Sequence, residues 1–332
     1  MGGDHAPGEI VAGAVLAARD GLGAMTLVGD RARLDPLLAE HGAEDIEVVH
    51  APNAVAMDAT PSQALRGSDD TSLGVVVNMV RDGQADAAVS AGNSGAFLAI
   101  GLVKLRTIAG IARPAIAVVF PGIKGPVVVL DSGANVDCRP EWMAQFGIMG
   151  SAYARGVLDI SNPRVGIISV GEERVKGNAQ TIEAAKALDD APVNFIGNVE
   201  GKDVFVNVAD VIVTDGFVGN VMLKLSEGAA QLLAEIIRNE VRGGGIFTMI
   251  GAQLMRPALR RVAARINYDN YGGAPLLGLR GTCIVAHGRA NRQAIRSAIR
   301  AATAAVREDV VAHIGEMATP HLVRVDGSAE ST

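Results

Sequence analysis

Val127-Val-Val-Leu-Asp-Ser-Gly-Ala-Asn135 is the stretch that decides the fold of this 332-residue chain. The stretch opens with a continuous apolar run, which is typical of a strand buried on both faces of a parallel sheet. The predicted strand ends at Asp131, small and polar residues follow, and a helical pattern begins near Pro140. This order predicts an α/β unit whose polar loop lies at the carboxyl edge of a sheet.

The same alternation recurs along the chain. Further strands are predicted at Ala24–Val28, Ile46–His50, Ala87–Ser90, Ala115–Phe120, Val165–Val170, Val193–Ile196, Val211–Thr214 and Thr282–Ala286. Helices are predicted near Glu9–Arg19, Arg31–His41, Ser72–Arg81, Gly95–Thr107, Pro140–Val157, Ala179–Leu188, Val221–Glu240 and Asn291–His313. This pattern predicts an α/β fold, a three-layer α/β/α sandwich with a mostly parallel sheet. We expect one such domain over residues 1–320 and a flexible tail over residues 321–332.

Composition limits the possible functions. The net charge of −6 gives no basic footprint for nucleic acid. The two cysteines, Cys138 and Cys283, lie far apart and outside any CxxC pattern, which argues against a disulfide scaffold or a zinc site. A signal peptide pattern is absent, and no apolar run approaches about 18 residues, so we expect a cytoplasmic protein. Dinucleotide, Walker A, GxSxG and HExxH motifs are absent too, and we expect no cofactor and no metal.

Glycine- and asparagine-rich loops follow three other predicted strands, at 91–95, 171–178 and 215–220. Small residues let backbone amides approach an anion, and the N-terminus of the following helix favours negative charge. The alternative for each loop is an ordinary helix cap, or a solvated charge cluster around Lys176. Several such loops at one sheet edge predict a single anion-binding crevice. Its candidate phosphate-binding residues are Gly92, Asn93, Ser94, Gly95, Asn178, Asp215 and Gly216.

The candidate catalytic residues are Lys176, Asn220 and Asn135. Lysine supplies a point charge to phosphate or to a developing oxyanion, and an asparagine amide donates a hydrogen bond to the oxyanion. An attack by bound phosphate on an activated acyl group needs these groups but no protein nucleophile. Cys138 is an alternative acyl carrier, but without an identifiable histidine partner a structural role is favoured.

Residues 243–270 break the strand–helix rhythm and predict a helical projection on a flexible joint at Gly243–Gly245. Pro257 predicts a kink or two short helices. The projection is interpreted either as core or dimer interface, or as a surface that meets anionic lipid or an acidic carrier protein. The candidate contact residues are Phe247, Ile250, Leu254, Leu259 and Arg260.

The chain resembles the PlsX phosphate acyltransferase family. The matching segments are Met1–Pro7, Ser90–Ala96, Leu130–Asn135, Lys176–Asn178, Asn198–Gly201, Thr214–Asn220, Tyr271–Pro275 and Ala286–Gly288, in the family's order. The resemblance implies an isocitrate/isopropylmalate dehydrogenase-like fold and a homodimer. It also implies conversion of acyl-[acyl-carrier protein] and orthophosphate into acyl phosphate and free carrier protein. The product would pass to a membrane glycerol-3-phosphate acyltransferase in phospholipid synthesis. If the projection meets anionic lipid, peripheral contact at the inner face of the membrane is expected.

Two departures from the family pattern accompany this resemblance. Family members usually carry a short apolar strand before the Met-Gly-Gly-Asp segment, so either an upstream strand or a sheet that lacks one is expected. Arg289 stands where small hydroxyl residues are common, and His5 and His287 remain alternative proton donors beside structural roles. The rival functions are a phosphate acetyltransferase that uses a coenzyme A thioester, a hydroxyacid dehydrogenase and a non-catalytic membrane-associated scaffold.

Overall fold

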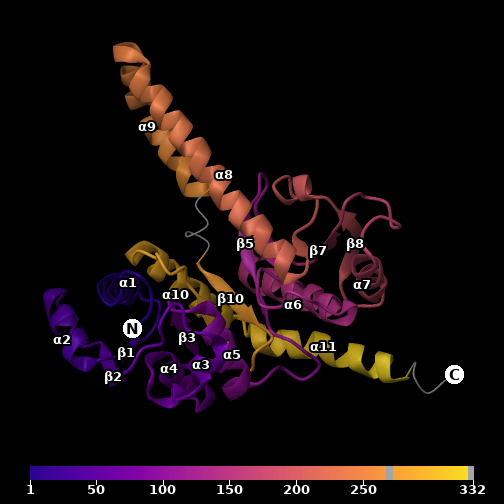
Figure 1. The fold of residues 1–332 in the computed structure, drawn as a ribbon, viewed down its shortest axis with the longest axis horizontal. Helices are drawn as coiled ribbons and strands as arrows, with labels where there is room; N and C mark the ends of the chain where they lie inside the picture. The colour runs from indigo at the N-terminus through magenta and orange to yellow at the C-terminus, as the bar shows by residue number, and fades with distance from the viewer. Residues whose placement is uncertain (267–271, 328–332) are drawn as a thin grey trace.

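The computed structural model describes residues 1–266 and 272–327 (Figure 1). The strands are β1 (Thr26–Gly29), β2 (Glu47–His50), β3 (Ala87–Ser90), β4 (Ala115–Ile116), β5 (Val118–Pro121), β6 (Pro126–Leu130), β7 (Arg164–Ile168), β8 (Asn194–Val199), β9 (Val211–Val213), β10 (Ala274–Leu277) and β11 (Thr282–Val285). The helices are α1 (Gly8–Arg19), α2 (Arg31–Glu40), α3 (Pro61–Leu65), α4 (Ser72–Arg81), α5 (Ser94–Leu105), α6 (Pro140–Leu158), α7 (Ala179–Asp189), α8 (Gly216–Gly243), α9 (Gly245–Ile266), α10 (Arg292–Arg307) and α11 (Val310–Gly327). Two 3₁₀ turns span Ser68–Asp70 and Gly201–Val204.

These strands form three sheets. β1 pairs with β2, a four-stranded sheet has the order β3-β11-β10-β4, and a five-stranded sheet has the order β5-β6-β9-β7-β8. Parallel pairing joins β6 to β9, β9 to β7 and β7 to β8, and it also joins β3 to β11 and β1 to β2. The predicted α/β fold with mostly parallel pairing is therefore confirmed.

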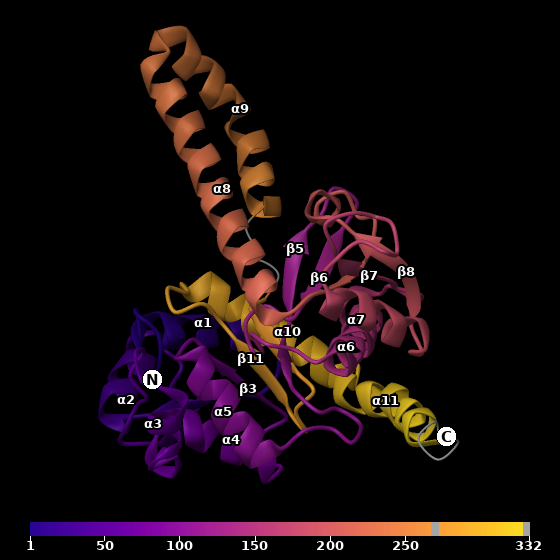
Figure 2. The same ribbon diagram turned by 45° about the vertical axis from the view of Figure 1, so that its right-hand side comes forward.

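The run that begins at Val127 forms β6, and both faces of this strand are covered. Val128 and Leu130 pack with α6, α7 and α11 in one core cluster. Val127 and Val129 belong to a second cluster on the opposite face, where Met222 of α8 packs. Successive side chains of a strand point to opposite faces, which is why a doubly covered strand has an unbroken apolar run. Figure 2 shows α6 and α7 beside this sheet.

The structure divides two predicted elements. The strand expected at 115–120 is two strands in two sheets, because the Ala117 N–H donates to Pro275 O while Val118 already pairs with Val129. The helix expected at 291–313 is divided into α10 and α11. Asp309 lies between them with a φ of 42°, which is not compatible with a continuing helix.

Two elements were not predicted. β10 contains Pro275, which lowers the strand propensity of a short segment. The five-residue helix α3 begins at Pro61 and is capped by Thr60, a boundary signal that its sequence does contain.

A hairpin of α8 and α9 forms the predicted helical projection (Figure 2). α8 has 28 residues and begins at Gly216, five positions before the predicted start, because Asp215 caps it. α9 is one continuous helix through Pro257, so the expected pair of short helices is wrong, while the expected kink stays a prediction. Gly244 lies between the two helices, and Gly245, the first residue of α9, has a φ of 73°. Residues 267–270 of the predicted projection lie outside the described part of the chain.

The C-terminal helix α11 ends at Gly327, so the first residues of the expected tail are helical, and 328–332 lie outside the described residues. Among residues 1–266 and 272–327, no helix has both the length and the apolar character needed to cross a membrane.

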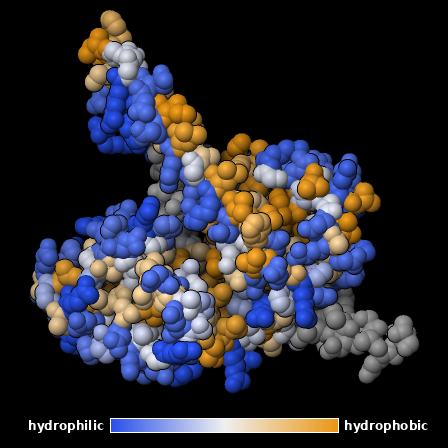
Figure 3. All heavy atoms as spheres, in the orientation of Figure 1, coloured by the Kyte–Doolittle hydropathy of each residue, from blue (hydrophilic) through white to orange (hydrophobic). Residues whose placement is uncertain are grey.

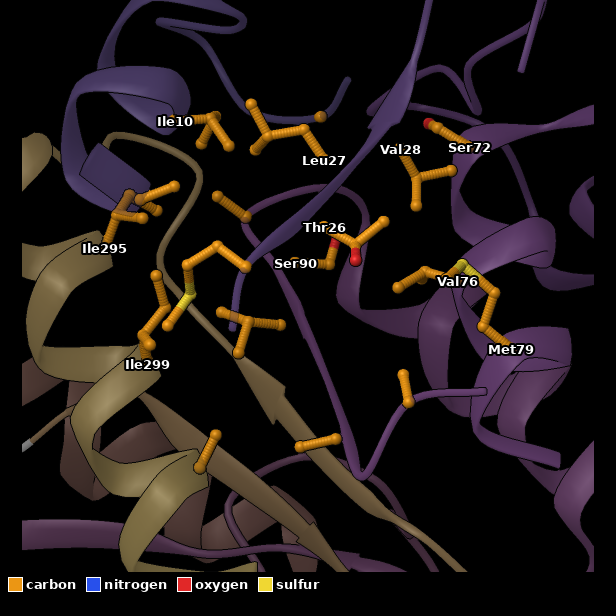
Figure 4. A pocket seen from close by; sticks show the side chains of 18 of the residues that line it. Ile10, Thr26, Leu27, Val28, Ser72, Val76, Met79, Ser90, Ile295 and Ile299 are labelled. Carbon is orange, nitrogen blue, oxygen red and sulfur yellow. The ribbon is translucent and has the colours of Figure 1, made fainter. Parts of the chain in front are cut away.

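A cavity of about 610 Å³ separates β1 from β3 (Figure 4). Its lining is mostly apolar and comes from α1, α4, α10 and both strands, with Ile10, Val28, Met79 and Ile299 among the labelled side chains. Within residues 1–266 and 272–327, β1 pairs only with β2, and β3 only with β11. The upstream strand that the resemblance implies stays a prediction.

Gly150 tests the contact between α6 and the five-stranded sheet. A Cβ at Gly150 would lie 2.4 Å from Val211 Cγ1 and 3.0 Å from Leu130 Cδ1. Gly150→Ala is therefore expected to lower the free energy of unfolding by about 1–3 kcal/mol. Gly228, on the exposed part of α8, is the control, because a Cβ added there would meet no atom within 4 Å. Gly228→Ala should raise the free energy of unfolding by about 0.5–1 kcal/mol. Urea unfolding of both variants measures the difference, and equal effects would contradict this packing.

Candidate functional site

The loop after β6 lies against the first turn of α8. The Gly216 N–H donates to Asn135 O at 2.7 Å. A Cβ placed on Gly133 would be 3.7 Å from Asn220 Cβ and 3.8 Å from Asn220 Oδ1. β6 and β9 are parallel neighbours, so their carboxyl ends share one sheet edge. The structure thus brings together Asn135, Gly216 and Asn220, which the sequence placed in one crevice.

Asp131 is the centre of this loop, and it is fully buried. Its Oδ1 accepts hydrogen bonds from the N–H groups of Ile116 (2.9 Å) and Ala134 (3.1 Å). Its Oδ2 accepts the N–H of Asn135 (2.6 Å) and the side-chain amide of Asn135 (3.0 Å). Burial raises the pKa of the Asp131 carboxyl, and the four donors oppose that rise.

The Asn135 amide has two acceptors within the protein. Its Nδ2 donates to Asp131 Oδ2 and to Pro114 O at 2.9 Å. In this arrangement the side chain ties the 131–135 loop to the segment before β4.

Asn220 differs from Asn135, because its exposed amide has no hydrogen-bond partner among the described residues. The Asn220 amide is therefore available to a ligand.

Asn198, near the end of β8, holds the Lys176 loop in place. Asn198 Nδ2 lies within hydrogen-bonding distance of three carbonyl oxygens of this loop, those of Gly171, Glu173 and Lys176. The Lys176 side chain is exposed and forms no ion pair within residues 1–266 and 272–327. β7 pairs with β9, so this loop lies at the same edge as Asn220. Sequence reasoning missed the role of Asn198, for which its place at a strand end was the available signal.

Three of the candidate phosphate-binding side chains are helix caps. Asn93 Oδ1 accepts the Ala96 N–H, Asn178 Oδ1 accepts the Thr181 N–H, and Asp215 Oδ1 accepts the Val218 N–H. These bonds match the capping alternative, and they orient each helix N-terminus toward its loop. Asn93 also donates to the carbonyls of Ala56, Met57 and Ala59.

The 92–95 loop follows β3 of the four-stranded sheet. Gly2 packs on it so closely that a Cβ there would lie 2.8 Å from Gly92 Cα, and the Asp4 N–H donates to Gly288 O. Ser94 is exposed, without a hydrogen-bond partner in the described chain. Hydrogen bonds between the described residues do not join this loop to 215–220. The two halves of the predicted crevice therefore belong to different sheets.

The two candidate histidines lie on the side of the 92–95 loop. His287 Nδ1 accepts the Arg289 N–H at 3.0 Å, and Arg289 lies 3.9 Å from Asp4. His5 is exposed, with no side-chain hydrogen bond to another described residue. This hydrogen bond at His287 agrees with a structural role, which was the alternative to a role as proton donor.

Carboxylates of Glu172, Glu200 and Asp203 gather beside the Lys176 loop, within 4.8 Å of one another. The Lys202 ammonium lies 2.5 Å from Glu200 and 3.8 Å from Glu172, and it offsets part of this charge. Glu172 is exposed, Glu200 is half-buried and Asp203 is buried, and Asp203 accepts the Glu200 N–H at 2.8 Å, so this group is an acidic turn with a lysine beside it.

The candidate contact residues of the projection lie on α9. Phe247 is 85% exposed, Leu254 is 78% exposed, and Ile250 and Leu259 are exposed to smaller degrees. Arg260 is also exposed. Figure 3 shows hydrophobic residues near the tip of the hairpin and again along α8 towards its base.

A family model described as fatty acid synthesis protein matches residues 1–313. A phosphate acyltransferase of Moorella thermoacetica is 46% identical over 318 residues, which cover 96% of this chain and 94% of the relative. A phosphate acyltransferase of Geotalea daltonii is 45% identical, with coverage of 95% and 92%. The chain belongs to the fatty acid synthesis protein family. The resemblance to the PlsX family is thus confirmed.

Solved structures with this fold include a phosphotransacetylase and a branched-chain phosphotransacylase. The phosphotransacetylase of Streptococcus pyogenes has a TM-score of 0.63 at 16% identity, over 91% of this family member and 92% of the other chain. A branched-chain phosphotransacylase of Enterococcus faecalis has a TM-score of 0.51 at 12% identity, with coverage of 86% and 99%. At these identities the likeness shows a shared fold and nothing about activity.

Cys138 gives a test of the acyl-carrier alternative. Burial raises the pKa of its thiol to about 12, and its Sγ donates to Asn135 O at 3.3 Å. At pH 8 only about one thiol in 10⁴ is then ionised, so iodoacetamide should modify the folded protein very slowly and the urea-unfolded protein readily. Cys138→Ala is expected to keep its turnover. Rapid labelling of the folded protein, together with loss of turnover in Cys138→Ala, would restore Cys138 as an acyl carrier.

Proposed function

We propose that this chain transfers an acyl group from acyl-carrier protein to orthophosphate, forming acyl phosphate, with Lys176 and Asn220 as its catalytic side chains. The observation that carries this proposal is the shared sheet edge after β6, β9 and β7. Lys176, in the loop after β7, forms no ion pair among the described residues, and the side-chain amide of Asn220, near the start of α8, forms no hydrogen bond among them. The names of relatives at about 45% identity support the same reaction.

The proposed step needs no covalent enzyme intermediate. A phosphate oxygen attacks the thioester carbon, and the carbonyl oxygen gains negative charge. The Asn220 amide donates to that oxyanion, and the Lys176 ammonium balances the charge of phosphate or of the tetrahedral intermediate. The carbon–sulfur bond then breaks, and the proton lost by phosphate ends on the pantetheine thiolate. Asn178 and Asn135 act through the loops that they hold.

Phosphate is proposed to lie at the N-terminus of α8. Gly216 lets the chain approach closely there, and the Phe217 N–H has no acceptor among the described residues. Both a free N–H and the helix dipole favour a bound anion. Gly92, Ser94 and Gly95 would complete the site from the four-stranded sheet, with Asn93 and Asp215 as caps that shape it.

A phosphate acetyltransferase acting on a coenzyme A thioester is the second candidate. Its support is the fold shared with phosphotransacetylases at 16% identity or less, and this is weaker than the support from full-length relatives at about 45%. Parallel assays with acetyl-coenzyme A and with palmitoyl-carrier protein distinguish the two candidates.

Further partners are proposed from the surface of the hairpin. The apolar side chains of Leu225, Leu232, Leu233, Ile236 and Ile237 are exposed along α8, and a second copy of the chain would cover such a stripe. The tip of α9 would contact the membrane surface, where a glycerol-3-phosphate acyltransferase receives the product. Phe247, Ile250 and Leu254 would enter the interface, and Arg260 would meet anionic head groups.

Lys176→Ala and Asn220→Ala are each expected to lower turnover about 100- to 1000-fold, because each removes a group that stabilises the transition state. Both side chains are exposed, so circular dichroism and the melting temperature should match the wild type. The assay follows acyl phosphate formed from palmitoyl-carrier protein and phosphate. Near wild-type turnover would remove that residue from the mechanism.

Leu254→Glu tests the membrane proposal. With vesicles that contain anionic lipid, the wild type is expected to float and the variant to float less, because a charge replaces an apolar side chain that enters the interface. Val103→Glu is the matched control, since Val103 is 61% exposed on α5, away from the hairpin. Equal flotation of Leu254→Glu and the wild type would contradict the proposed contact.

A further inference from the structure

We propose that Asp131 is a positioning residue, which holds the 131–135 loop so that the Gly133 N–H and the Asn220 amide bind the thioester oxygen together. The inference rests on the proposed function, because it assumes the oxyanion role of Asn220. It adds a second donor, from the backbone, and names the group that fixes its place.

The hydrogen bonds of the loop single out Gly133. The Ser132 N–H donates to Ile116 O, and the N–H groups of Ala134 and Asn135 donate to Asp131. The Gly133 N–H has no acceptor within the described residues, and Gly133 is exposed. An exposed, unpaired N–H on an otherwise fixed loop is the kind of donor that an oxyanion site uses.

Gly133 is also the loop residue that faces Asn220. The Cβ position of Gly133 lies 3.8 Å from Asn220 Cγ and from Asn220 Oδ1, so the two residues are in contact distance. The φ of Gly133 is 131°, a value that L side chains rarely adopt. The loop therefore keeps a glycine where its N–H is unpaired and its neighbour is the proposed catalytic amide.

A carboxylate at position 131 is required by its surroundings. All four of its side-chain contacts are N–H donors, two on each oxygen. An isosteric asparagine would place its own NH₂ against two of these donors, whichever way it turned. Such a buried mismatch would shift the loop, and with it the Gly133 N–H.

Asp131 also fixes the loop to the rest of the protein. The Ile116 N–H donates to Asp131, and Ile116 O accepts the Ser132 N–H, so this loop of the five-stranded sheet is bonded to β4 of the four-stranded sheet. On the other side, a Cβ at Gly219 would lie 1.9 Å from Asp131 O, which means that α8 packs directly on the Asp131 backbone. One residue thus sets the position of the loop relative to the helix that carries Asn220.

Asp131→Asn is the test. Its kcat should fall about 10- to 100-fold with little change in the KM for phosphate, since an interaction made in the transition state is lost. Asp30→Asn is the matched control: Asp30 is a half-buried cap of α2 that accepts one N–H, from Ala32, and an amide oxygen can replace it. An unchanged kcat in a folded Asp131→Asn would overturn the inference, even if the melting temperature fell.

A double-mutant cycle separates positioning from general destabilisation. If Asp131 acts through the oxyanion site, Asp131→Asn should lower kcat by less than about threefold when Asn220→Ala is already present. Equal fold losses in both backgrounds would overturn the inference. An inactive Asn220→Ala beside an active Asp131→Asn would overturn this inference alone, whereas an active Asn220→Ala would overturn the proposed function as well.

Asn135→Ala serves if Asp131→Asn does not fold. It removes one of the four donors to Asp131 and leaves the carboxylate with three. A smaller loss of kcat is expected, about 10-fold, again reduced in the Asn220→Ala background. A kcat equal to that of the wild type would overturn the inference.

Discussion

The buried carboxylate of Asp131 is the interaction on which the site depends. An ionised carboxylate in an apolar interior is costly unless it is fully hydrogen-bonded, and here four N–H groups surround it. Those donors come from β4 and from the loop itself, so the hydrogen bonds to one carboxylate fix two stretches of backbone, at Ile116 and at Ala134–Asn135. The conformation of the 131–135 loop is thereby fixed by a buried side chain.

Close approach of α8 to this loop depends on two glycines. Gly216 and Gly219 lie so near to Asn135 O and Asp131 O that any side chain would collide with backbone atoms, at 2.6 Å and 1.9 Å. Because backbone atoms cannot rotate away, these contacts differ from those of Gly101, whose neighbour is the end of a leucine side chain. The loop and the helix therefore form one packed unit, and Asn220 on the first turns of α8 is held with it.

Local sequence was sufficient for most elements, although several strand boundaries differ from the predicted ones by one to three residues. The apolar run before Asp131 reflects burial on both faces, and the Asn and Asp residues after the strands are indeed caps or hydrogen-bonded loop residues. Which strands pair, and which distant residue supports a loop, could not be predicted from local sequence, because both depend on contacts between distant segments. The change of sheet at Ala117 follows from a bond to Pro275, and the support of the Lys176 loop follows from Asn198 on another strand. Neither pairing leaves a periodic signal in the sequence.

The long helix α8 joins two regions with different physical character. Its first turns pack on the 131–135 loop, while the rest of its 28 residues leave the core and expose apolar side chains such as Leu225 and Leu232. Helical hydrogen bonds make such an element stiff, so a tilt of the exposed end is transmitted to the turn that carries Asn220. The contacts of Gly216 and Gly219 with the loop oppose that tilt at its base. The position of Asn220 in the proposed site thus depends on the contacts of Gly216 and Gly219 with the loop around Asp131.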